Sequence, residues 1–461
     1  MQDSPERRIA EFLAQANSML PGRCNSGEAV RRQHANTLTY IATQPPDAVI
    51  WPKSTSEVVQ LVHLAGYHRV PLIGFGAGTS LEGHVNAPMG GVAVDFALMN
   101  SVLEIRPDDL DCTVEAGVTL DRLRAELRAT GLFFPVDPGS GHATLGGMAA
   151  TRASGTTTVR YGSMRENVIN IRAVLASGEI VSTARRARKS AAGYDLTRLL
   201  VGSEGTLGLI TELTLKLHGV PEAIVAATAA FPTVDAACRA SVSAIQAGLC
   251  VARIELLDAV QMQCVRTYSK IDLPAVPSLF LEFHGSTAAC QGDLQSFCEI
   301  AANEGGYNIQ SAADDAGRKV LWTARHDAFW AVQAAWPGML LLVTDVAVPL
   351  SKLAAAVSET ADDIRSSGLT APIAGHVGDG NFHAIVVVDP ADIEQRHRVA
   401  AFLDRLVERA LALDGTATGE HGVGQGKSRY MAREHGSGVE VMRAIKHALD
   451  PLNIFNPGKI F

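Results

Sequence analysis

Residues 74–83 read Gly74-Phe75-Gly76-Ala77-Gly78-Thr79-Ser80-Leu81-Glu82-Gly83, directly after an apolar run over 70–73 that predicts a β-strand. Glycines at 74, 76 and 78 remove side chains from the backbone, so several amides can face an anion such as a pyrophosphate. A Rossmann site would also need an amphipathic helix directly after the glycines, whereas residues 90–95 predict a second strand. The loop therefore predicts phosphate binding outside a Rossmann fold, and a glycine-rich turn without a ligand is the alternative.

The composition is that of a folded protein of two or three domains. The chain has 461 residues, of which 47% are hydrophobic and 19% are charged. It is too long for one ordinary core and too apolar for a disordered chain. A formal net charge of -8 without a long basic run argues against a nucleic acid as partner.

Targeting signals are not visible in the sequence. Seven cysteines without a close-spaced pair predict reduced thiols. The first residues lack the apolar core of a signal peptide, and no run of eighteen apolar residues predicts a transmembrane helix. We therefore expect a cytoplasmic protein, and peripheral membrane contact and a homodimer are compatible with this sequence.

Two later segments are also rich in small residues. Residues 144–151, Thr-Leu-Gly-Gly-Met-Ala-Ala-Thr, carry a small side chain at almost every position, so a large flat group can lie against their backbone. Residues 202–208 form another glycine loop, which leads into a strand over 212–217. With the loop at 74–83, these segments indicate that the first half of the chain holds a large ligand.

Three segments in this order, Gly74–Gly83, Asp137–Gly162 and Gly202–Ile210, resemble the flavin-binding domain of the vanillyl-alcohol oxidase superfamily. The resemblance implies an α+β fold in which two small subdomains hold FAD. His84 and His142 lie near these loops, but neither is in a recognised linkage motif, so non-covalent FAD is expected. The implied FAD contacts are Gly74, Phe75, Gly76, Ala77, Gly78, Thr79 and Ser80 around the pyrophosphate, Pro138, Gly139, Leu145, Gly146, Ala150, Ser154, Gly155 and Tyr161 along the flavin, and Glu204, Gly205 and Ile210 on the adenine side.

Near Gly219-Val220-Pro221 the pattern changes to longer amphipathic helices that alternate with single strands. Helices are predicted over 233–247 and 294–304, and strands over 253–257 and 278–283. This pattern predicts a second α+β domain, a cap. The predicted organisation is an N-terminal helix and lead-in (1–39), an FAD-binding domain (40–220), a cap domain (221–424) and a C-terminal segment (425–461) that returns to the FAD-binding domain.

The cap contains a candidate metal site. His376 and His383 flank a Gly-Asp-Gly turn that leads into an apolar strand, so both imidazoles can point at one place. Two unrelated loop histidines are the alternative. Glu420 is the candidate third ligand, which leaves positions for a substrate, and a polar loop is the alternative for Glu420 and His421. The adjacent His421 points the opposite way on an extended backbone, so it can act as a base beside the metal.

Arg325 lies in a segment, 321–327, that is predicted to be helical. An arginine in such a place is usually a surface charge. Alternatively, its guanidinium can hold a substrate carboxylate through two hydrogen bonds. The residues alone favour the surface charge.

The second half also resembles the FAD-linked D-2-hydroxy acid dehydrogenases, and most closely the D-lactate dehydrogenases that reduce a cytochrome. The resemblance rests on Trp322 with Arg325, Asp345–Pro349, Gly375–His383, Gly419–Gly424 and the tail from Asp450 to Lys459. It implies His376, His383 and Glu420 as metal ligands, His421 as base, Arg325 as carboxylate anchor, and Asn456 of the tail against the cofactor. Relatives that act on 2-hydroxyglutarate carry a polar residue at the position of Ile385, so an apolar substrate tail is expected here.

The implied reaction is metal-assisted oxidation of a small D-2-hydroxy acid, such as D-lactate, with hydride transfer to flavin N5 and His421 as base. Zinc, manganese and iron(II) all fit the ligand set. Cytochrome c, a quinone or an electron-transfer flavoprotein would accept the electrons. Alternatives are a glycolate-oxidising catalytic subunit, a flavin-dependent ether-lipid synthase, and a non-catalytic electron-transfer subunit. An electron-transfer subunit needs no metal and base site, so the presence of His376, His383, Glu420 and His421 argues against it.

Overall fold

The computed structural model describes residues 4–35 and 40–461. The first three residues and the end of the predicted lead-in, 36–39, lie outside the described residues. The chain forms two compact units. Unit 1 contains Met1–Ser154, Gly162–Val220 and Glu420–Phe461, and unit 2 contains Gly155–Tyr161 and Pro221–Gly419.

These limits differ from the predicted domain organisation at two places. The chain returns to unit 1 at Glu420, whereas the sequence predicted the return at residue 425. Gly155–Tyr161, from within the predicted FAD-binding range, groups with unit 2. In that segment Arg160 donates to the backbone oxygens of Cys250 and His284, which ties it to the strands of unit 2. Sequence spacing carries no signal of such a pairing.

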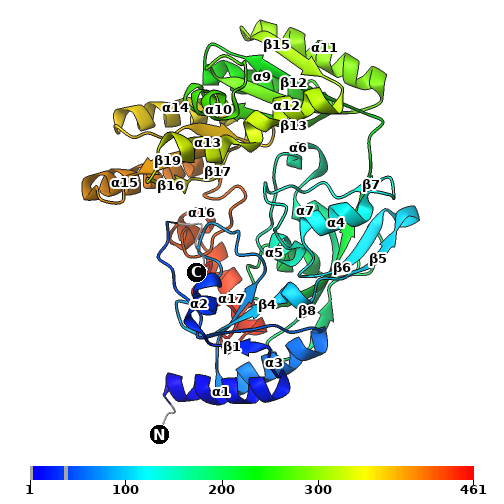
Figure 1. Cartoon of the computed structure of the whole chain (residues 1–461), viewed down its shortest axis with the longest axis vertical. Coiled ribbons are helices and arrows are strands. Elements are labelled where there is room, and N and C mark those ends of the chain that lie inside the picture. The colour runs from blue at the N-terminus through cyan, green and yellow to red at the C-terminus, as the bar shows by residue number, and fades with distance from the viewer. Residues whose placement is uncertain (1–3, 36–39) are drawn as a thin grey trace. The chain divides into compact units, whose positions relative to one another are not determined.

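One of the two larger sheets of unit 1 contains the glycine loop (Figure 1). Its strands run in the order β1 (Cys24–Asn25), β2 (Ala48–Ile50), β4 (Val92–Asp95) and β3 (Leu72–Phe75), and β2, β4 and β3 are parallel. Residues 76–91, all of which the structure describes, contain no helix. The glycine loop therefore connects two neighbouring parallel strands without the helix of a Rossmann unit, as predicted.

Helix α3 (Thr55–His68) precedes this loop. The side chain of Ser54 accepts a hydrogen bond from the backbone N–H of Glu57, which is the ordinary N-cap bond. Glu57 in turn accepts from Lys53 N and binds Arg23. Leu61, Val62 and other apolar residues of the helix are buried, so α3 holds the loop-bearing sheet against the core.

The second sheet of unit 1 is antiparallel throughout. Its strands run in the order β5 (Val102–Arg106), β6 (Asp111–Glu115), β10 (Leu209–Lys216), β8 (Val168–Val174) and β9 (Ile180–Ser182). One hydrophobic core contains residues of both sheets, including Val92 and Val94 of β4 and Leu213 of β10. The two-subdomain α+β fold is therefore present. A short pair, β7 (Leu132–Phe133) with β11 (His218–Gly219), and the helices α1 (Pro5–Met19), α2 (Glu28–Gln33), η1 (Phe96–Leu98), η2 (Pro107–Asp109), α4 (Leu120–Leu127), α5 (Leu145–Ala150), α7 (Met164–Asn167), α8 (Leu196–Leu200), η4 (Ser428–Tyr430), α16 (Met431–His435) and α17 (Gly438–Leu449) complete the unit.

The C-terminal tail lies against β3, in agreement with the predicted return to the first domain. Leu72 donates to Ile454 O at 2.7 Å, and Asn456 donates back to Leu72 O at 2.9 Å. Phe455, between them, is 0% exposed and belongs to the core of the unit. Residues 454–456 therefore form a short parallel bridge with the sheet that carries the glycine loop.

Unit 2 is built on one large antiparallel sheet. Its strands run in the order β15 (Tyr307–Ala312), β12 (Ala223–Ala230), β14 (Ser278–Gly285), β13 (Val251–Leu257), β18 (Ile373–Gly375), β19 (Asn381–Val388) and β16 (Leu340–Val343), and β17 (Val346–Ala347) also pairs with β19. The helices are α6 (Thr158–Tyr161), α9 (Val234–Gln246), α10 (Ala259–Ser269), α11 (Thr287–Asn303), α12 (Asp315–His326), α13 (Ala328–Ala335), η3 (Leu350–Lys352), α14 (Leu353–Ser366) and α15 (Ile393–Ala412). The predicted α+β cap is therefore present.

One core of unit 2 lies between the sheet and the helices α10, α12 and α13. Met262 of α10, Trp322 of α12 and Val332 of α13 pack there against Phe280 of β14 and Ile385 of β19. This packing fixes α12 against the sheet, which matters because α12 carries Arg325.

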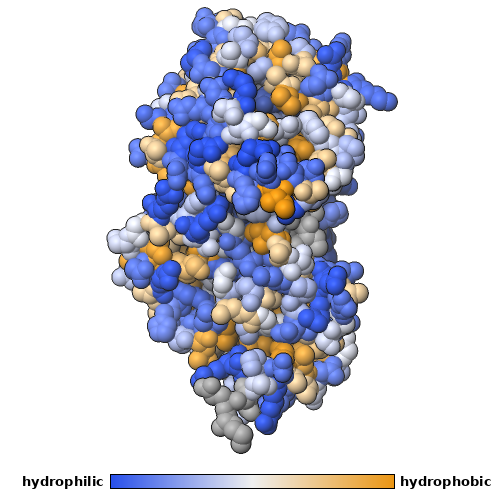
Figure 2. Space-filling view, turned by 90° about the vertical axis from the view of Figure 1, so that its left-hand side faces the viewer, coloured by the Kyte–Doolittle hydropathy of each residue, from blue (hydrophilic) through white to orange (hydrophobic). Residues whose placement is uncertain are grey.

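The surface shows no unusual hydrophobic character where it is visible. On the face that Figure 2 shows, hydrophobic residues lie in small groups between hydrophilic ones. In residues 4–35 and 40–461, no helix combines the length and the hydropathy that a membrane span requires. Scattered apolar residues are ordinary on protein surfaces.

The position of Phe455 gives a test of the tail's role. Phe455→Ala should lower the free energy of unfolding by roughly 3–5 kcal/mol, because it deletes a fully buried ring and leaves a cavity. Thermal unfolding followed by circular dichroism measures the effect. The control is Leu452→Ala, which truncates a neighbour that is 48% exposed. If both variants unfold at the wild-type temperature, the tail does not hold the sheet.

Candidate active site

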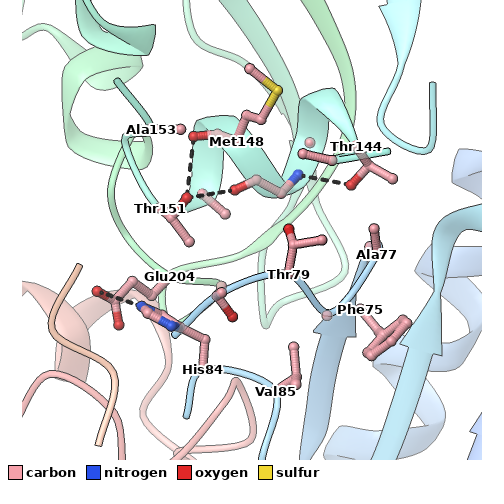
Figure 3. A pocket seen from close by; sticks show the side chains of 18 of the residues that line it. Phe75, Ala77, Thr79, His84, Val85, Thr144, Met148, Thr151, Ala153 and Glu204 are labelled. Atoms are coloured by element: carbon pink, nitrogen blue, oxygen red, sulfur yellow. Dashed lines mark hydrogen bonds and ion pairs between the residues drawn. The ribbon is translucent and has the colours of Figure 1, made fainter. Parts of the chain in front are cut away.

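A cavity in unit 1 is lined by the glycine loop on one side and by residues around α5 on the other (Figure 3). Glu204, Gly205, residues 208–210 and the first residues after the return of the chain to unit 1 also line it. Small side chains and glycines dominate these walls, which suits a large flat ligand held close to backbone. The predicted FAD contacts that line the cavity are Gly74, Phe75, Gly76, Ala77, Gly78, Thr79, Ser80, Pro138, Gly146, Ala150, Ser154, Glu204, Gly205, Ile210 and Asn456, and Glu420 and His421 line it as well.

Four of the predicted contacts are not among the lining residues, which are Gly139, Leu145, Gly155 and Tyr161. Leu145 is the first residue of α5, and its side chain is buried in the core of unit 1 instead. Gly155 and Tyr161 belong to unit 2, where the Tyr161 hydroxyl bonds His284 Nδ1 at 2.7 Å. A sequence motif predicts that a segment lies near a ligand, but it does not predict which side chains of that segment face the ligand.

Gly76 is where the loop comes closest to α5. A Cβ at Gly76 would lie 2.1 Å from Thr144 Oγ1 and 3.3 Å from Thr144 Cβ. Thr144 cannot easily move, because its hydroxyl accepts from Gly147 N and caps α5. Glycine at 76 is therefore required for the loop to approach α5 and close this wall of the cavity.

His84 and Glu204 form a buried pair at the cavity that the sequence did not predict (Figure 3). His84 Nε2 lies 3.2 Å from Glu204 Oε1. The carboxylate also accepts from Val423 N at 2.6 Å and from Gly424 N at 2.8 Å. Burial alone would raise the pKa of Glu204, but His84 and these two N–H groups lower it below its ordinary value. Glu204 therefore stays ionised and holds the segment directly after His421.

Asn456 joins the tail to the same pair. Its Nδ2 donates to His84 O at 3.1 Å and to Glu204 O at 2.7 Å. The resemblance implied Asn456 beside the cofactor, and the structure places it in the cavity wall. The sequence suggested His84 only as a residue near the flavin loops that could carry a covalent link. Its pairing with Glu204, 120 residues further along the chain, could not be predicted from the sequence.

In unit 2, β18 and β19 form the hairpin that brings the two predicted histidines together. His376 follows the last residue of β18, and His383 lies in β19 opposite Ala374. Their ring centroids are 5.4 Å apart with an interplanar angle of 84°. The tight turn needs Gly380, which has a φ of 85° and whose added Cβ would lie 2.0 Å from Val348 O. The predicted convergence of His376 and His383 is therefore observed.

The hydrogen bonds of these two rings fix their tautomers. His383 Nδ1 lies 2.9 Å from Thr344 O, and His376 Nδ1 lies 2.7 Å from Glu255 Oε1. Because a carbonyl and a carboxylate can only accept, each Nδ1 carries the hydrogen and each neutral ring has its lone pair on Nε2. This is the arrangement that metal-ligating histidines adopt, so the donor chemistry fits a cation.

Glu255 stays ionised in this setting. Burial on its own would raise the pKa of the Glu255 carboxyl, but the charges and hydrogen bonds of His376 and Arg325 lower it below its ordinary value. Arg325 donates from Nε to Glu255 Oε2 at 2.7 Å, and its side chain is 16% exposed. The surface-charge alternative for Arg325 is therefore wrong. Sequence reasoning missed Glu255, although a lone acidic residue in the apolar strand Val251–Leu257 was a usable signal.

Glu420 is the first residue of unit 1 after the chain leaves unit 2. The preceding Gly419 packs against the start of β19, since its added Cβ would lie 2.1 Å from Asn381 Nδ2 and 2.9 Å from Asp345 Oδ1. Asn381 itself donates to Asp345 Oδ1 at 2.7 Å. Within unit 1, Glu420 Oε2 accepts from Ser154 Oγ at 2.9 Å. The chain thus passes from unit 2 to unit 1 between Gly419 and Glu420.

Solved structures resemble the chain in fold. The 4-ethylphenol oxidase from Gulosibacter chungangensis superposes with a TM-score of 0.83 at 18% identity, covering 100% of this chain and 98% of that chain. An alkyldihydroxyacetonephosphate synthase superposes with a TM-score of 0.73 at 22% identity, covering 97% and 84%. The chain therefore has the fold of these two proteins.

Sequence comparisons are more specific. The family model "FAD linked oxidases, C-terminal domain" matches residues 220–460, and "FAD binding domain" matches residues 46–184. The probable mitochondrial D-lactate dehydrogenase of Danio rerio is 49% identical over 94% of this chain and 88% of its own. The mitochondrial D-lactate dehydrogenase [cytochrome] of Arabidopsis thaliana is 44% identical over 98% and 80%. The glycolate oxidase subunit GlcD of Bacillus subtilis is 37% identical over 98% and 96%.

The chain therefore belongs to the FAD-linked oxidase family, and it is an FAD-dependent oxidoreductase with D-lactate dehydrogenases among its relatives. The residues of the cavity fit the cofactor, because the loop and α5 present backbone and small side chains. Two of these relatives are named as mitochondrial proteins. The cytoplasmic location of this chain stays a prediction.

The close approach at Gly76 predicts a loss of cofactor. Gly76→Ala should push the loop away from Thr144 and yield protein with a much lower ratio of flavin to protein absorbance. Gly66→Ala is the matched control, since Gly66 lies in α3 and its added Cβ meets nothing within 4 Å. A Gly76→Ala protein that retains full FAD would contradict the assignment of this loop to the cofactor.

Proposed function

We propose that this protein oxidises a small D-2-hydroxy acid, with D-lactate as the preferred substrate, to the 2-oxo acid with the help of a divalent cation. The observation that carries the proposal is the histidine pair of the β18–β19 hairpin, whose Nδ1 atoms are both held by acceptors. A flavoprotein that only relays electrons has no need of two imidazoles prepared in this way.

His376, His383 and Glu420 would hold the cation. The support for Glu420 is its chain neighbour Gly419, which packs beside Asn381 at the start of the strand that carries His383. Two imidazoles and one carboxylate suit zinc, manganese or iron(II) and leave positions for a substrate. When bound, the cation supplies a positive charge that lowers the pKa of a coordinated hydroxyl. FAD, when bound, supplies the acceptor for the hydride from the substrate Cα.

His421 would take the proton of the substrate hydroxyl on an imidazole nitrogen. It follows Glu420 directly and lines the cavity of unit 1. The ordinary pKa of imidazole, about 6.5, suits a general base near neutral pH. The bonds from Val423 N and Gly424 N to Glu204 hold the segment after His421, and this supports a fixed position for the base.

Arg325 would bind the substrate carboxylate. Its Nε is engaged by Glu255, and a guanidinium carries further N–H groups that can meet a carboxylate. Ile385 lies on β19 two residues after His383, so both side chains are on the same face of the strand. It is buried in the core around Trp322. Apolar surroundings of this kind favour a short apolar substrate tail over a second carboxylate.

The electrons would leave FAD to an external acceptor. One relative reported above is named as a D-lactate dehydrogenase of the cytochrome type, which favours a cytochrome. A quinone and an electron-transfer flavoprotein are the alternatives from the sequence.

Glycolate is the second candidate substrate, because the Bacillus subtilis relative is a glycolate oxidase subunit. Glycolate and lactate differ by one methyl group, and a methyl in an apolar pocket changes specificity by only about 1–3 kcal/mol. An ether-lipid synthase, the third alternative, would catalyse a transfer without net reduction of its flavin.

Anaerobic mixing with a panel of 2-hydroxy acids separates these functions. We expect D-lactate to bleach the flavin absorbance faster than glycolate, and L-lactate to leave it unchanged. Stopped-flow absorbance at the flavin maximum gives the rates. A flavin that no D-2-hydroxy acid reduces would contradict the proposed activity.

Substitutions at Glu420 and His421 test the two roles separately. His421→Ala should keep FAD and metal but slow flavin reduction by D-lactate by about 10²–10⁴-fold, the usual contribution of a general base. Glu420→Ala should lower the metal content without lowering FAD, as measured by elemental analysis and absorbance. His397→Ala and Glu440→Ala alter exposed residues and serve as controls. Near-normal turnover in His421→Ala would remove it from the base role, and full metal occupancy in Glu420→Ala would remove it from the ligand set.

A further inference from the structure

Glu255 occupies an unusual place for a carboxylate. It lies in the middle of β13, between β14 and β18, and it is 0% exposed. A carboxylate in the interior is costly unless hydrogen bonds and opposite charges compensate it. The compensation here comes from two groups of the proposed site.

Both oxygens of Glu255 are used, each by a different group. Oε1 receives the Nδ1 hydrogen of His376 at 2.7 Å, and Oε2 receives the Nε hydrogen of Arg325 at 2.7 Å. His376 follows β18, and Arg325 lies on α12, so one side chain connects two elements that are far apart in sequence. Each partner depends on the same rigid carboxylate plane for its orientation.

Stability alone is a weak reason for this arrangement. Replacing a buried ion pair by apolar residues of similar volume often leaves stability unchanged or increases it. The strand around Glu255 is otherwise apolar, with Ile254, Leu256 and Leu257 buried. A role in orienting His376 and Arg325 therefore explains the buried charge of Glu255 better than a contribution to stability does.

We propose that Glu255 is a positioning residue that couples cation binding to recognition of the substrate carboxylate, an inference that rests on the proposed function. Through Oε1 it keeps the hydrogen of His376 on Nδ1, so that Nε2 has the lone pair for the cation. Through Oε2 it fixes the plane of the Arg325 guanidinium. The cation and the carboxylate anchor thereby share one support.

A glutamine at position 255 would break this arrangement with little change in shape. An amide offers one acceptor oxygen and one NH₂ donor, whereas Glu255 meets two donors. If the NH₂ faces His376, it favours the tautomer with the hydrogen on Nε2, which removes the lone pair from the ligating atom. If the NH₂ faces Arg325, two donors face each other and the guanidinium turns away.

The neighbouring strand provides a matched control. Glu282 of β14 is also buried, and it also lies between a histidine and an arginine. His284 Nε2 is 2.7 Å and Arg253 Nε is 3.5 Å from its Oε1. Glu282→Gln therefore makes the same chemical change in the same sheet at a carboxylate that contacts neither His376 nor Arg325.

The experiment compares Glu255→Gln with Glu282→Gln in the full-length, FAD-loaded protein. Zn²⁺ and Mn²⁺ affinities are measured by competition with a chromogenic chelator, and KM and kcat for D-lactate by steady-state kinetics. For Glu255→Gln we expect metal affinity to fall by about 10–100-fold, the usual effect of removing such a support, and KM to rise by about tenfold. Glu282→Gln should retain wild-type metal affinity and KM. Wild-type metal affinity and KM in a folded Glu255→Gln protein would overturn the proposal, and so would an equal loss in both variants.

Glu255→Asp is the second test variant, to be used if Glu255→Gln does not fold. It keeps the charge but shortens the side chain by one methylene, so it cannot reach both partners, and the same losses are expected. Unchanged metal affinity and KM in that variant would overturn the proposal. If the wild-type protein oxidises no D-2-hydroxy acid, the proposed function fails, whereas weakened metal binding in the Glu255 variants would still support the coupling to His376.

Discussion

Two imidazoles donate their Nδ1 hydrogens to groups that cannot donate in return, and the proposed cation site depends on this constraint. Thr344 O and the Glu255 carboxylate hold His383 and His376 in one tautomer. The hairpin of β18 and β19 supplies the spacing, and a glycine at 380 allows the turn. Without these bonds nothing would fix the tautomers of the two rings. The proposed chemistry of unit 2 depends on them.

In unit 1 the backbone around the cavity is constrained by close packing and by hydrogen bonds. The glycine loop can approach α5 only because position 76 lacks a side chain, and Thr144 is held in place as the cap of α5. Glu204 then binds the backbone at Val423 and Gly424, directly after the residue proposed as base. Asn456 of the C-terminal tail donates a hydrogen bond to the backbone oxygen of Glu204. Segments separated by more than two hundred residues thus form one cavity wall.

Much of this architecture could be predicted from sequence because its signals are local. The Ser54 cap, the glycine loop without a following helix and the two histidines beside a Gly-Asp-Gly turn each act over a few residues. Strand β12 was missed because five of its eight residues are alanine, which has little preference for strands. Glu255, His84 and the grouping of Gly155–Tyr161 with unit 2 were missed because they depend on partners far along the chain. The bond between the Tyr161 hydroxyl and His284 Nδ1 joins residues 123 positions apart, and it could not be read from the sequence either.

The central claim is that a cation on His376, His383 and Glu420 assists the oxidation of a D-2-hydroxy acid. The most direct measurement is the rate of anaerobic flavin reduction by D-lactate in FAD-loaded protein, before and after treatment with a chelator and again after a divalent cation is restored. The account predicts that the rate collapses on chelation while the flavin stays bound, and that it recovers with the cation. An unchanged rate in metal-free protein would contradict it.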